Sequence, residues 1–262
     1  MHGSPSIEPQ QSARAAVAEL FRAHGNDVFG IGLKMCGNRT DAEDLVQETF
    51  LRAYRDWPSY QGRSSPTTWL YTIAVRVCRR MHRRRAGEPP QLEPITWDAR
   101  GEDLSSQRDG PLEKAARSEA REVVQRAISR LPLHYRLPLA LKELTDFSVE
   151  EVAAITGLKA ATVRTRVHRA RLQLAKEIAR NQGANGDDVP CSRLCRDLLV
   201  VKQRSLDDGT PFHLPPEESC ESCRTVFSGL DAGQRACRET ARRELPSEIQ
   251  RLLWDELTAG NA

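Results

Sequence analysis

Apolar residues recur at helical spacing over most of this chain, most clearly in the stretch 145–176. Ser148 followed by Glu151 has the spacing of a capping box, which predicts the start of a helix that Gly157 ends. A second helix should follow, with Thr162 as its cap. Its apolar positions lie three or four residues apart and would face the first helix: Val163, Val167, Ala170 and Leu174. Two short helices joined by a glycine turn predict a helix-turn-helix.

The opposite side of the second helix is basic, and no Asp or Glu occurs between Lys159 and Lys176. Arginines on such a helix can reach guanine edges in the major groove together with neighbouring phosphates. The alternative is an amphipathic helix with a solvated basic side, but the turn glycine and the acid-free helix together favour DNA recognition. The residues that we expect to contact DNA here are Lys159, Thr162, Arg164, Arg166, His168, Arg169 and Arg171.

The periodicity before this motif predicts further helices. From Ser12 to Met35 a helical pattern is broken near Gly25, and Thr40 then caps a second helical segment. The exposed side of that segment is acidic, through Asp41, Asp44 and Glu48. Acidic residues in a first turn are ordinary helix chemistry, so the residues alone favour a structural role.

The segment 57–87 has no acidic residue and mixes arginines with aromatic rings. This combination suits single-stranded or distorted DNA, because guanidinium groups hold phosphates while exposed bases stack. Four apolar positions are interpreted as core: Trp69, Leu70, Ile73 and Val77. The candidates for DNA contact are Arg63, Arg76, Arg79, Arg80 and Arg83.

Composition changes mark the boundaries between domains. Pro, Gly, Asp and Ser dominate 88–111, and a second short break occurs at 181–190. We therefore expect an all-α protein with two small helical domains, the second a helix-turn-helix, joined by a flexible linker, and a small Cys-rich helical domain at the end. The predicted ranges are a flexible tail 1–12, a first domain 13–87, a linker 88–111, a second domain 112–180, a linker 181–190 and a Cys-rich domain 191–262.

Overall composition supports this organisation and excludes some classes. Charged residues make up 29% of the 262 residues and aromatics only 5%, which is typical of a helical protein. The net charge of +3 conceals local basic blocks that matter more for nucleic-acid contact. No apolar run reaches bilayer-spanning length and the N-terminus lacks the apolar core of a signal peptide, so we expect a cytoplasmic protein without a membrane partner. The sequence has no phosphate-binding glycine loop and no evident pairing of a nucleophile with a base. We therefore do not expect an enzyme.

Seven cysteines in a cytoplasmic protein point to thiols, metal or redox chemistry. Cys220 and Cys223 form a CxxC pair, and Cys191 and Cys195 lie one helical turn apart. These four thiolates have the ligand types and number of a tetrahedral zinc site. Cys36 and Cys78 fall in the first domain and are interpreted as buried apolar residues.

Four stretches together resemble bacterial RNA polymerase sigma factors of the extracytoplasmic-function (ECF) group, over roughly residues 13–180. They appear in the family's order, with the linker between the second and the third: 41–55, 60–80, 128–144 and 147–174. The resemblance implies that the first domain binds core RNA polymerase and opens the promoter, and that the second reads the −35 element of promoter DNA. It assigns the acidic helix to the polymerase clamp coiled coil, through Asp41, Glu43, Asp44, Gln47 and Glu48.

By the same resemblance the loop from Tyr60 to Ser65 holds a flipped base of the −10 element, and recapture in a pocket offsets the cost of unstacking. Arg76 to Arg80 would grip the adjacent DNA, although the family usually has asparagine at the position of Arg76. The DNA-binding residues expected in the first domain are Tyr60, Gly62, Arg63, Ser64, Trp69, Arg76, Arg79, Arg80 and Arg83. At the −35 element DNA shape and phosphate contacts contribute, so no arginine is assigned to a single base.

The stretch 195–224 resembles the zinc-binding domain of anti-sigma factors, in which a cysteine, a histidine and a CxxC pair hold one zinc. The fourth ligand is therefore either Cys191 or His213. A structural zinc, a metal- or redox-sensing site and plain buried cysteines remain as alternatives. We expect regulation of the sigma factor in cis by this domain, which could pack on one of the DNA-binding domains. Its final helix would present one apolar side, formed by Ile249, Leu252, Leu253 and Leu257.

Two rival functions remain at the level of sequence. A self-contained helix-turn-helix repressor or activator that senses metal or redox state would bind duplex DNA without polymerase. A single-strand binding module based on 60–85 would bind without sequence preference and with strong salt dependence. The sequence leaves open whether a separate anti-sigma factor is a further partner.

Overall fold

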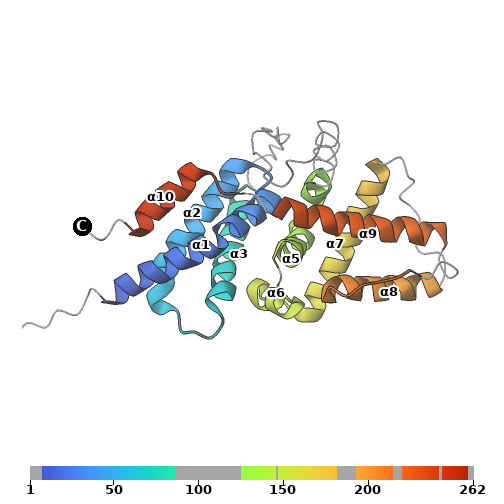
Figure 1. Ribbon diagram of the computed structural model, residues 1–262, viewed down its shortest axis with the longest axis horizontal. Helices are drawn as coiled ribbons and strands as arrows, with labels where there is room; N and C mark the ends of the chain where they lie inside the picture. Colours follow the sequence, from blue (N-terminus) through green and yellow to red (C-terminus); the bar gives the residue numbers. More distant parts are fainter. Residues whose placement is uncertain are drawn as a thin grey trace, which may run out of the picture. The chain divides into compact units, whose positions relative to one another are not determined.

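The computed structural model is helical in each regular element that it describes, as predicted from the periodicity (Figure 1). The residues described are 8–85, 125–145, 147–181, 193–214, 220–241 and 244–258. They belong to two compact units. The first unit contains the described residues of 1–96, 153–157 and 241–262, and the second contains those of 97–152 and 158–240. The predicted linker 88–111 and residues 182–190 of the second predicted linker lie outside the described residues.

The first unit packs three N-terminal helices and the last helix of the chain around one core. Its elements are α1 (Glu8–Cys36), α2 (Arg39–Asp56), the short 3₁₀ helix η1 (Trp57–Ser59), α3 (Pro66–Arg85) and α10 (Ser247–Thr258). The rings of Phe21 and Phe50 meet edge to face with centroids 5.0 Å apart. Fully buried apolar side chains from each of the three N-terminal helices complete this core, among them Val28, Leu45, Leu70 and Val77.

Two local predictions for this unit are wrong. The helix does not break at Gly25, because a single glycine is tolerated inside a helix. A Cβ at this position would lie 3.0 Å from the Phe21 ring, so the close packing there favours glycine. The second helix begins at Arg39, before the predicted cap Thr40. Its cap is Asn38, whose Oδ1 accepts a 2.8 Å hydrogen bond from the Asp41 backbone N–H.

The second unit contains the helix-turn-helix and the cysteine-rich helices. Its labelled elements are α5 (Leu133–Leu144), the first half of α6 (Val149–Thr156), α7 (Ala160–Asn181), α8 (Arg193–Asp208) and α9 (Glu221–Ala241). The predicted capping box is present: the Glu151 backbone N–H donates to Ser148 Oγ at 3.2 Å, and the Ser148 N–H donates to Glu151 Oε2 at 2.8 Å. Gly157 takes a φ of +70° after α6, which an L side chain rarely adopts.

Helix α7 begins three residues earlier than predicted. Its first residue is Ala160, and the N–H of the predicted cap Thr162 donates to Lys159 O, so Thr162 already lies within the first turn. The predicted apolar positions of α7 are fully or almost fully buried, and this side packs against α5. The stripe that the sequence indicated is therefore the core of the helix-turn-helix.

Helices α8 and α9 run side by side in the same direction (Figure 1). Lys202 Nζ of α8 lies 2.5 Å from Asp231 Oδ1 of α9, and the ring of Phe212 meets that of Phe227 edge to face. Leu206, Phe227 and Leu230 form a buried cluster with Ala175 of α7.

Two glycines let α9 approach α7 closely. A Cβ at Gly229 would lie 3.2 Å from the Ala175 Cβ, and one at Gly233 would lie 3.2 Å from a Leu174 methyl carbon. Larger residues at these positions would push the helices apart. The α8–α9 pair is therefore packed directly on the predicted recognition helix.

The last helix, α10, packs in the first unit on α1 and α2. Leu253 and Leu257 are almost fully buried there, but Leu252 is 61% exposed, so the predicted apolar side of this helix is wrong at that position. The Leu245 backbone N–H donates to Asn26 Oδ1 at 2.9 Å, and the Arg22 guanidinium carbon lies 5.2 Å from the centroid of the Trp254 ring. The predicted Cys-rich range 191–262 thus contributes to both units. Within the described residues no helix combines the length and apolarity that a membrane crossing requires.

Candidate nucleic-acid interface and metal centre

The acidic residues of α2 differ in how much charge they offer to a partner. Asp44 is exposed, and Glu43 pairs at 2.8 Å with Arg39 on the same helix. Asp41 is only 6% exposed and lies at the helix cap. Glu48 accepts from Arg52 at 2.5 Å and from Arg80 of α3 at 2.8 Å. Asp44 is therefore the carboxylate of this predicted polymerase-binding set that is most available, with the half-buried Gln47 one turn away.

The loop between η1 and α3 is supported by three aromatic rings. The Tyr60 ring centroid lies 5.1 Å from that of Trp69 and 5.2 Å from that of Trp57. The Tyr60 hydroxyl donates to the Ser64 carbonyl oxygen, and Gly62 takes a φ of +68° at the turn. Arg63 and Ser64 are exposed. Trp57 was not predicted to belong to this site, although its position directly before Pro58 and the loop was a usable signal.

The basic side of α3 is partly free. Arg76 and Arg83 are exposed, whereas Arg79 and Arg80 are half-buried. Arg80 is engaged by Glu48, and the neighbouring His82 ring contacts the Met35 carbonyl oxygen at 2.9 Å. Among the α3 arginines whose side chains the structure describes, Arg76 and Arg83 are thus the two that solvent reaches best.

The predicted DNA contacts on α7 fall into three groups by exposure. Lys159, Arg164 and Arg169 are exposed, and Arg164 makes a 3.6 Å surface ion pair with Glu150. Three further side chains are half-buried: Thr162, Arg166 and His168. Arg171 is 4% exposed, because carboxylates from two other helices enclose its guanidinium group.

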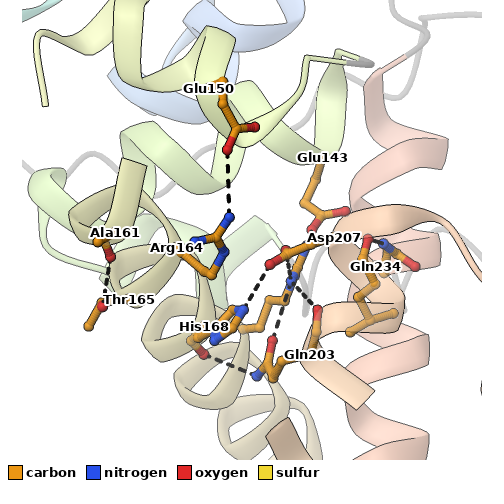
Figure 2. A network of polar contacts seen from close by, with 11 residues as sticks. Glu143, Glu150, Ala161, Arg164, Thr165, His168, Gln203, Asp207 and Gln234 are labelled. Carbon is orange, nitrogen blue, oxygen red and sulfur yellow. Dashed lines mark hydrogen bonds and ion pairs between the residues drawn. The ribbon is translucent and has the colours of Figure 1, made fainter. Parts of the chain in front are cut away.

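A polar network surrounds Arg171. Its Nη2 lies 2.6 Å from Glu143 Oε1 of α5, and its Nη1 lies 2.6 Å from Asp207 Oδ1 of α8. The His168 ring and the Asp207 carboxylate point toward each other (Figure 2), and His168 Nε2 lies 2.9 Å from Asp207 Oδ2. Gln203 accepts from Arg171 Nη1 at 3.3 Å and donates to the His168 carbonyl oxygen at 3.3 Å. The network joins α5, α7 and α8.

Asp207 is ionised in this network. Burial raises the pKa of its carboxyl group, but the hydrogen bond from His168 and the charge of Arg171 outweigh burial and hold the pKa below its ordinary value. An ionised carboxylate can only accept, so the Nε2 of His168 carries the proton that it donates. Sequence patterns around α7 do not predict this contact, because Asp207 follows Arg171 by 36 positions.

Three cysteine sulfurs gather where α8 and α9 begin. The Sγ atoms of Cys195, Cys220 and Cys223 all lie within 4.8 Å of one another, and the Cys195–Cys220 separation is 3.8 Å. Four thiolates at about 2.3 Å from a tetrahedral zinc would be spaced by about 3.8 Å, so these residues fit such an ion. The three residues could therefore hold a metal. His213 is exposed and is not in this group, and Cys191 lies outside the described residues.

The three thiols perturb one another. Burial, followed by the hydrogen bonds and charges of Cys195 and Cys220, raises the pKa of Cys223 to about 12. Of the cysteines interpreted as apolar, Cys78 is buried as predicted, whereas Cys36 is only half-buried.

Family comparisons match the two helical units separately. Residues 20–88 match Sigma-70 region 2, and residues 121–174 match Sigma-70, region 4. Helices α8, α9 and α10 lie beyond both matches.

Three curated relatives give the same result. The chain is 33% identical over 171 residues to the ECF RNA polymerase sigma factor SigE of Mycolicibacterium smegmatis, a match that covers 65% of each protein. It is 33% identical over 172 residues to the ECF RNA polymerase sigma-E factor of Haemophilus influenzae, covering 64% of this chain and 90% of that protein. It is 31% identical over 168 residues to the ECF RNA polymerase sigma factor SigW of Bacillus subtilis, covering 62% of this chain and 89% of that protein.

Proposed function

Because the chain belongs to the ECF group of RNA polymerase sigma factors, we propose that it binds core RNA polymerase and directs initiation at specific promoters. The observation that carries this proposal is the match to both sigma-70 regions in order, on two separate helical units. A stand-alone helix-turn-helix repressor or activator would have no use for the region 2 unit, so that alternative is not favoured. A sigma factor is not itself an enzyme, and it acts where the polymerase acts, in the cytoplasm.

Core polymerase would be bound through α2. Asp44 and Gln47 lie one turn apart, and Asp44 is exposed without a neighbouring cation in the contacts that the structure shows. Glu43 adds a partly exposed carboxylate paired only with a surface arginine. A surface pair of this kind contributes little to folding and can be exchanged for a partner's cation.

The −10 element would be held by the loop after η1 and by α3. The three rings under this loop provide a base with a stacking surface, and Arg63 stands exposed at the turn. Arg76 and Arg83 would hold adjacent phosphates. Stacking and phosphate contact together offset the few kcal/mol that unstacking a base costs.

The −35 element would be met by the start of α7. A helix-turn-helix contacts base edges with the N-terminal residues of its second helix. The exposed side chains in that part are Lys159, Arg164 and Thr165, with Arg169 one turn further on. They present positive charge on a helix end that is not covered by other described residues.

Zinc would be held by Cys195, Cys220 and Cys223, with a fourth ligand from Cys191 or His213. Three sulfurs at tetrahedral spacing, two of them buried, support this assignment. Zinc bound there would cross-link the first turns of α8 and α9 and so contribute directly to the folding of that pair.

Promoter-directed initiation is tested by adding the chain to purified core polymerase on a promoter library and mapping the transcript starts. We expect starts at a defined set of sequences. Asp44→Lys should lower their yield by about tenfold or more, because it places a cation where the partner requires an acid. Glu19 is an exposed residue of α1, and Glu19→Lys makes the same change of charge. This variant should keep the yield within about twofold. Starts that do not depend on the chain would overturn the sigma function.

The zinc assignment is tested by metal analysis of the purified chain. One zinc per chain is expected, lost in Cys223→Ser and kept in Cys36→Ser. Equal zinc content in the two variants would contradict the assignment.

A further inference from the structure

One side of the recognition helix α7 is open at its start and covered further along. Arg164, His168 and Arg171 follow one another at spacings of four and three residues, so they share this side. The side chain of Arg164 is 45% exposed, that of His168 23% and that of Arg171 only 4%. The covered part is therefore the later turns of a helix whose whole basic side was predicted to meet DNA.

The cover comes from helices that lie beyond the region 4 match. Helix α8 supplies Asp207 and Gln203, which contact His168 (Figure 2). The same two residues also contact Arg171. Helix α9 lies against the next turns of α7 through Gly229 and Gly233. A sigma factor that ends after region 4 would have this side of α7 free.

In the covered part of α7, carboxylates outnumber the positive charge. Arg171 carries one positive charge but faces two carboxylates, Glu143 and Asp207, each 5% exposed or less. Glu143 belongs to α5 and is part of the helix-turn-helix itself, so Asp207 is the charge that the extra helices add. A DNA phosphate that approached here would meet a carboxylate that is already bonded to His168 and Arg171.

Helices α7 and α8 together are also too wide to enter the major groove of DNA. The major groove is about 12 Å wide, which is about the diameter of one helix with its side chains. Helix α8 is attached to α7 by contacts of 2.6 to 2.9 Å at His168 and Arg171, so those turns cannot enter the groove while α8 stays. The first two turns of α7 remain open, which predicts weakened DNA binding and not its complete loss.

We propose that the α8–α9 pair is a built-in inhibitor of DNA binding by α7, in which Asp207 holds His168 and Arg171 away from the phosphate backbone. Release of the pair frees this side of the helix. The proposal deepens the proposed function and rests on α7 being the DNA-reading helix. The released state would bind duplex DNA more tightly and with a steeper dependence on salt.

The test compares two variants of the full chain that carry the same charge change. Asp207→Asn removes the contact, whereas Asp208→Asn removes an exposed neighbouring carboxylate. Binding to a mixed-sequence duplex of about three helical turns is measured by fluorescence anisotropy over a range of salt. We expect Asp207→Asn to bind about tenfold more tightly than the unaltered chain, and Asp208→Asn within about twofold. The slope of log K against log salt should steepen by about 1 for Asp207→Asn only, since one further cation reaches a phosphate.

Equal binding and equal slopes for the two variants would overturn the inhibitor. Far-ultraviolet circular dichroism checks that each variant keeps its helices. If Asp207→Asn loses them, Gln203→Ala takes its place, because it removes two contacts with α7 and no charge. A gain of about threefold is then expected, and no gain contradicts the proposal.

Failure of the inhibitor and failure of the sigma function are distinguishable. Duplex binding needs no polymerase, so the anisotropy result stands whether or not the chain directs initiation. Initiation at defined promoters without any difference between the two variants would leave a sigma factor whose α8–α9 pair is only structural.

Discussion

Helices α3 and α7 carry similar arginine-rich sequences but present them differently. On α3, Arg76 and Arg83 reach solvent, and Glu48 of the adjacent α2 pairs with Arg80. On α7, Arg171 is buried between two carboxylates, one of which comes from the extra helix α8. Arg76 is therefore available to DNA, whereas Arg171 is part of the folded interior. Local basic charge does not by itself identify a DNA contact.

The two environments give arginine different energetic roles. An exposed guanidinium group contributes little to folding, so Arg76 can be optimised for a ligand. A buried one is compensated by its partners, and removal of either side leaves an uncompensated charge. This contrast can be tested at four levels, the first three on stability and the last on DNA binding.

The largest difference is expected between Arg171→Ala and Arg76→Ala. Arg171→Ala leaves Glu143 and Asp207 buried without their cation and should destabilise the second unit by about 3–5 kcal/mol. Arg76→Ala should change stability by less than about 0.5 kcal/mol. Chemical denaturation followed by circular dichroism measures both. Similar losses in the two variants would mean that Arg171 is not buried in solution.

Metal removal should destabilise the α8–α9 pair, which covers α7, and leave α3 unchanged. With free zinc about 100-fold above its Kd, bound metal stabilises the folded site by about 2.7 kcal/mol. Chelation, or Cys223→Ser, should therefore lower the amide-exchange protection of α8 and α9 by up to about 100-fold. Hydrogen exchange read by mass spectrometry resolves the helices, and the peptides of α3 are the internal control. Unchanged protection in α8 would show that the thiolate site does not hold the pair together.

Acid should weaken the contact between α8 and α7. The lowered pKa of Asp207 means that its ionised form stabilises the fold at every pH above the ordinary carboxylic pKa of about 3.9. This contribution is lost as pH falls through the lower pKa of the folded chain. The titratable and charged groups around Asp207 are Arg171 and His168 on α7 and Glu143 on α5.

The difference in the free energy of unfolding between the unaltered chain and Asp207→Asn should thus be largest at pH 7 and should disappear at acid pH. Urea midpoints over a pH series give this difference, with Asp208→Asn as the control. A difference that stays constant down to the lowest pH would contradict an ionised Asp207.

The smallest expected effect concerns the open end of α7. Lys159→Ala should weaken duplex binding to a similar degree on different sequences and reduce the salt slope by about 1, because an exposed lysine at this place contacts phosphate. Salt titrations of binding measure this change. A loss confined to one sequence would instead indicate base recognition by Lys159.

Local sequence signals predicted much of this fold. The capping box of Ser148 and Glu151, the glycine turn at Gly157 and the apolar stripe of α7 all depend on neighbours within a few positions, and all are present. The caps were less certain, because Thr40 and Thr162 are good capping residues that stand close to the true helix starts. Leu252 was misplaced because the register of α10 depends on what it packs against.

The site was predictable only where it is local in sequence. The CxxC pair and Cys195 were identified from spacing, and their sulfurs do meet. The burial of Arg171 could not be predicted, because it depends on Asp207 from another helix far along the chain. Periodicity shows that a helix has a polar side, but not which later helix will cover that side.

The most direct test of the covered helix is arginine modification of the free chain with a dicarbonyl reagent, quantified by mass spectrometry. Arg76 and Arg164 should react quickly, and Arg171 at least about tenfold more slowly, because only a buried and ion-paired guanidinium group is protected. Arg164 controls for position on the same helix. In Asp207→Asn, Arg171 should become more reactive. Reaction of Arg171 at the rate of Arg164 in the unaltered chain would show that α8 does not cover the recognition helix.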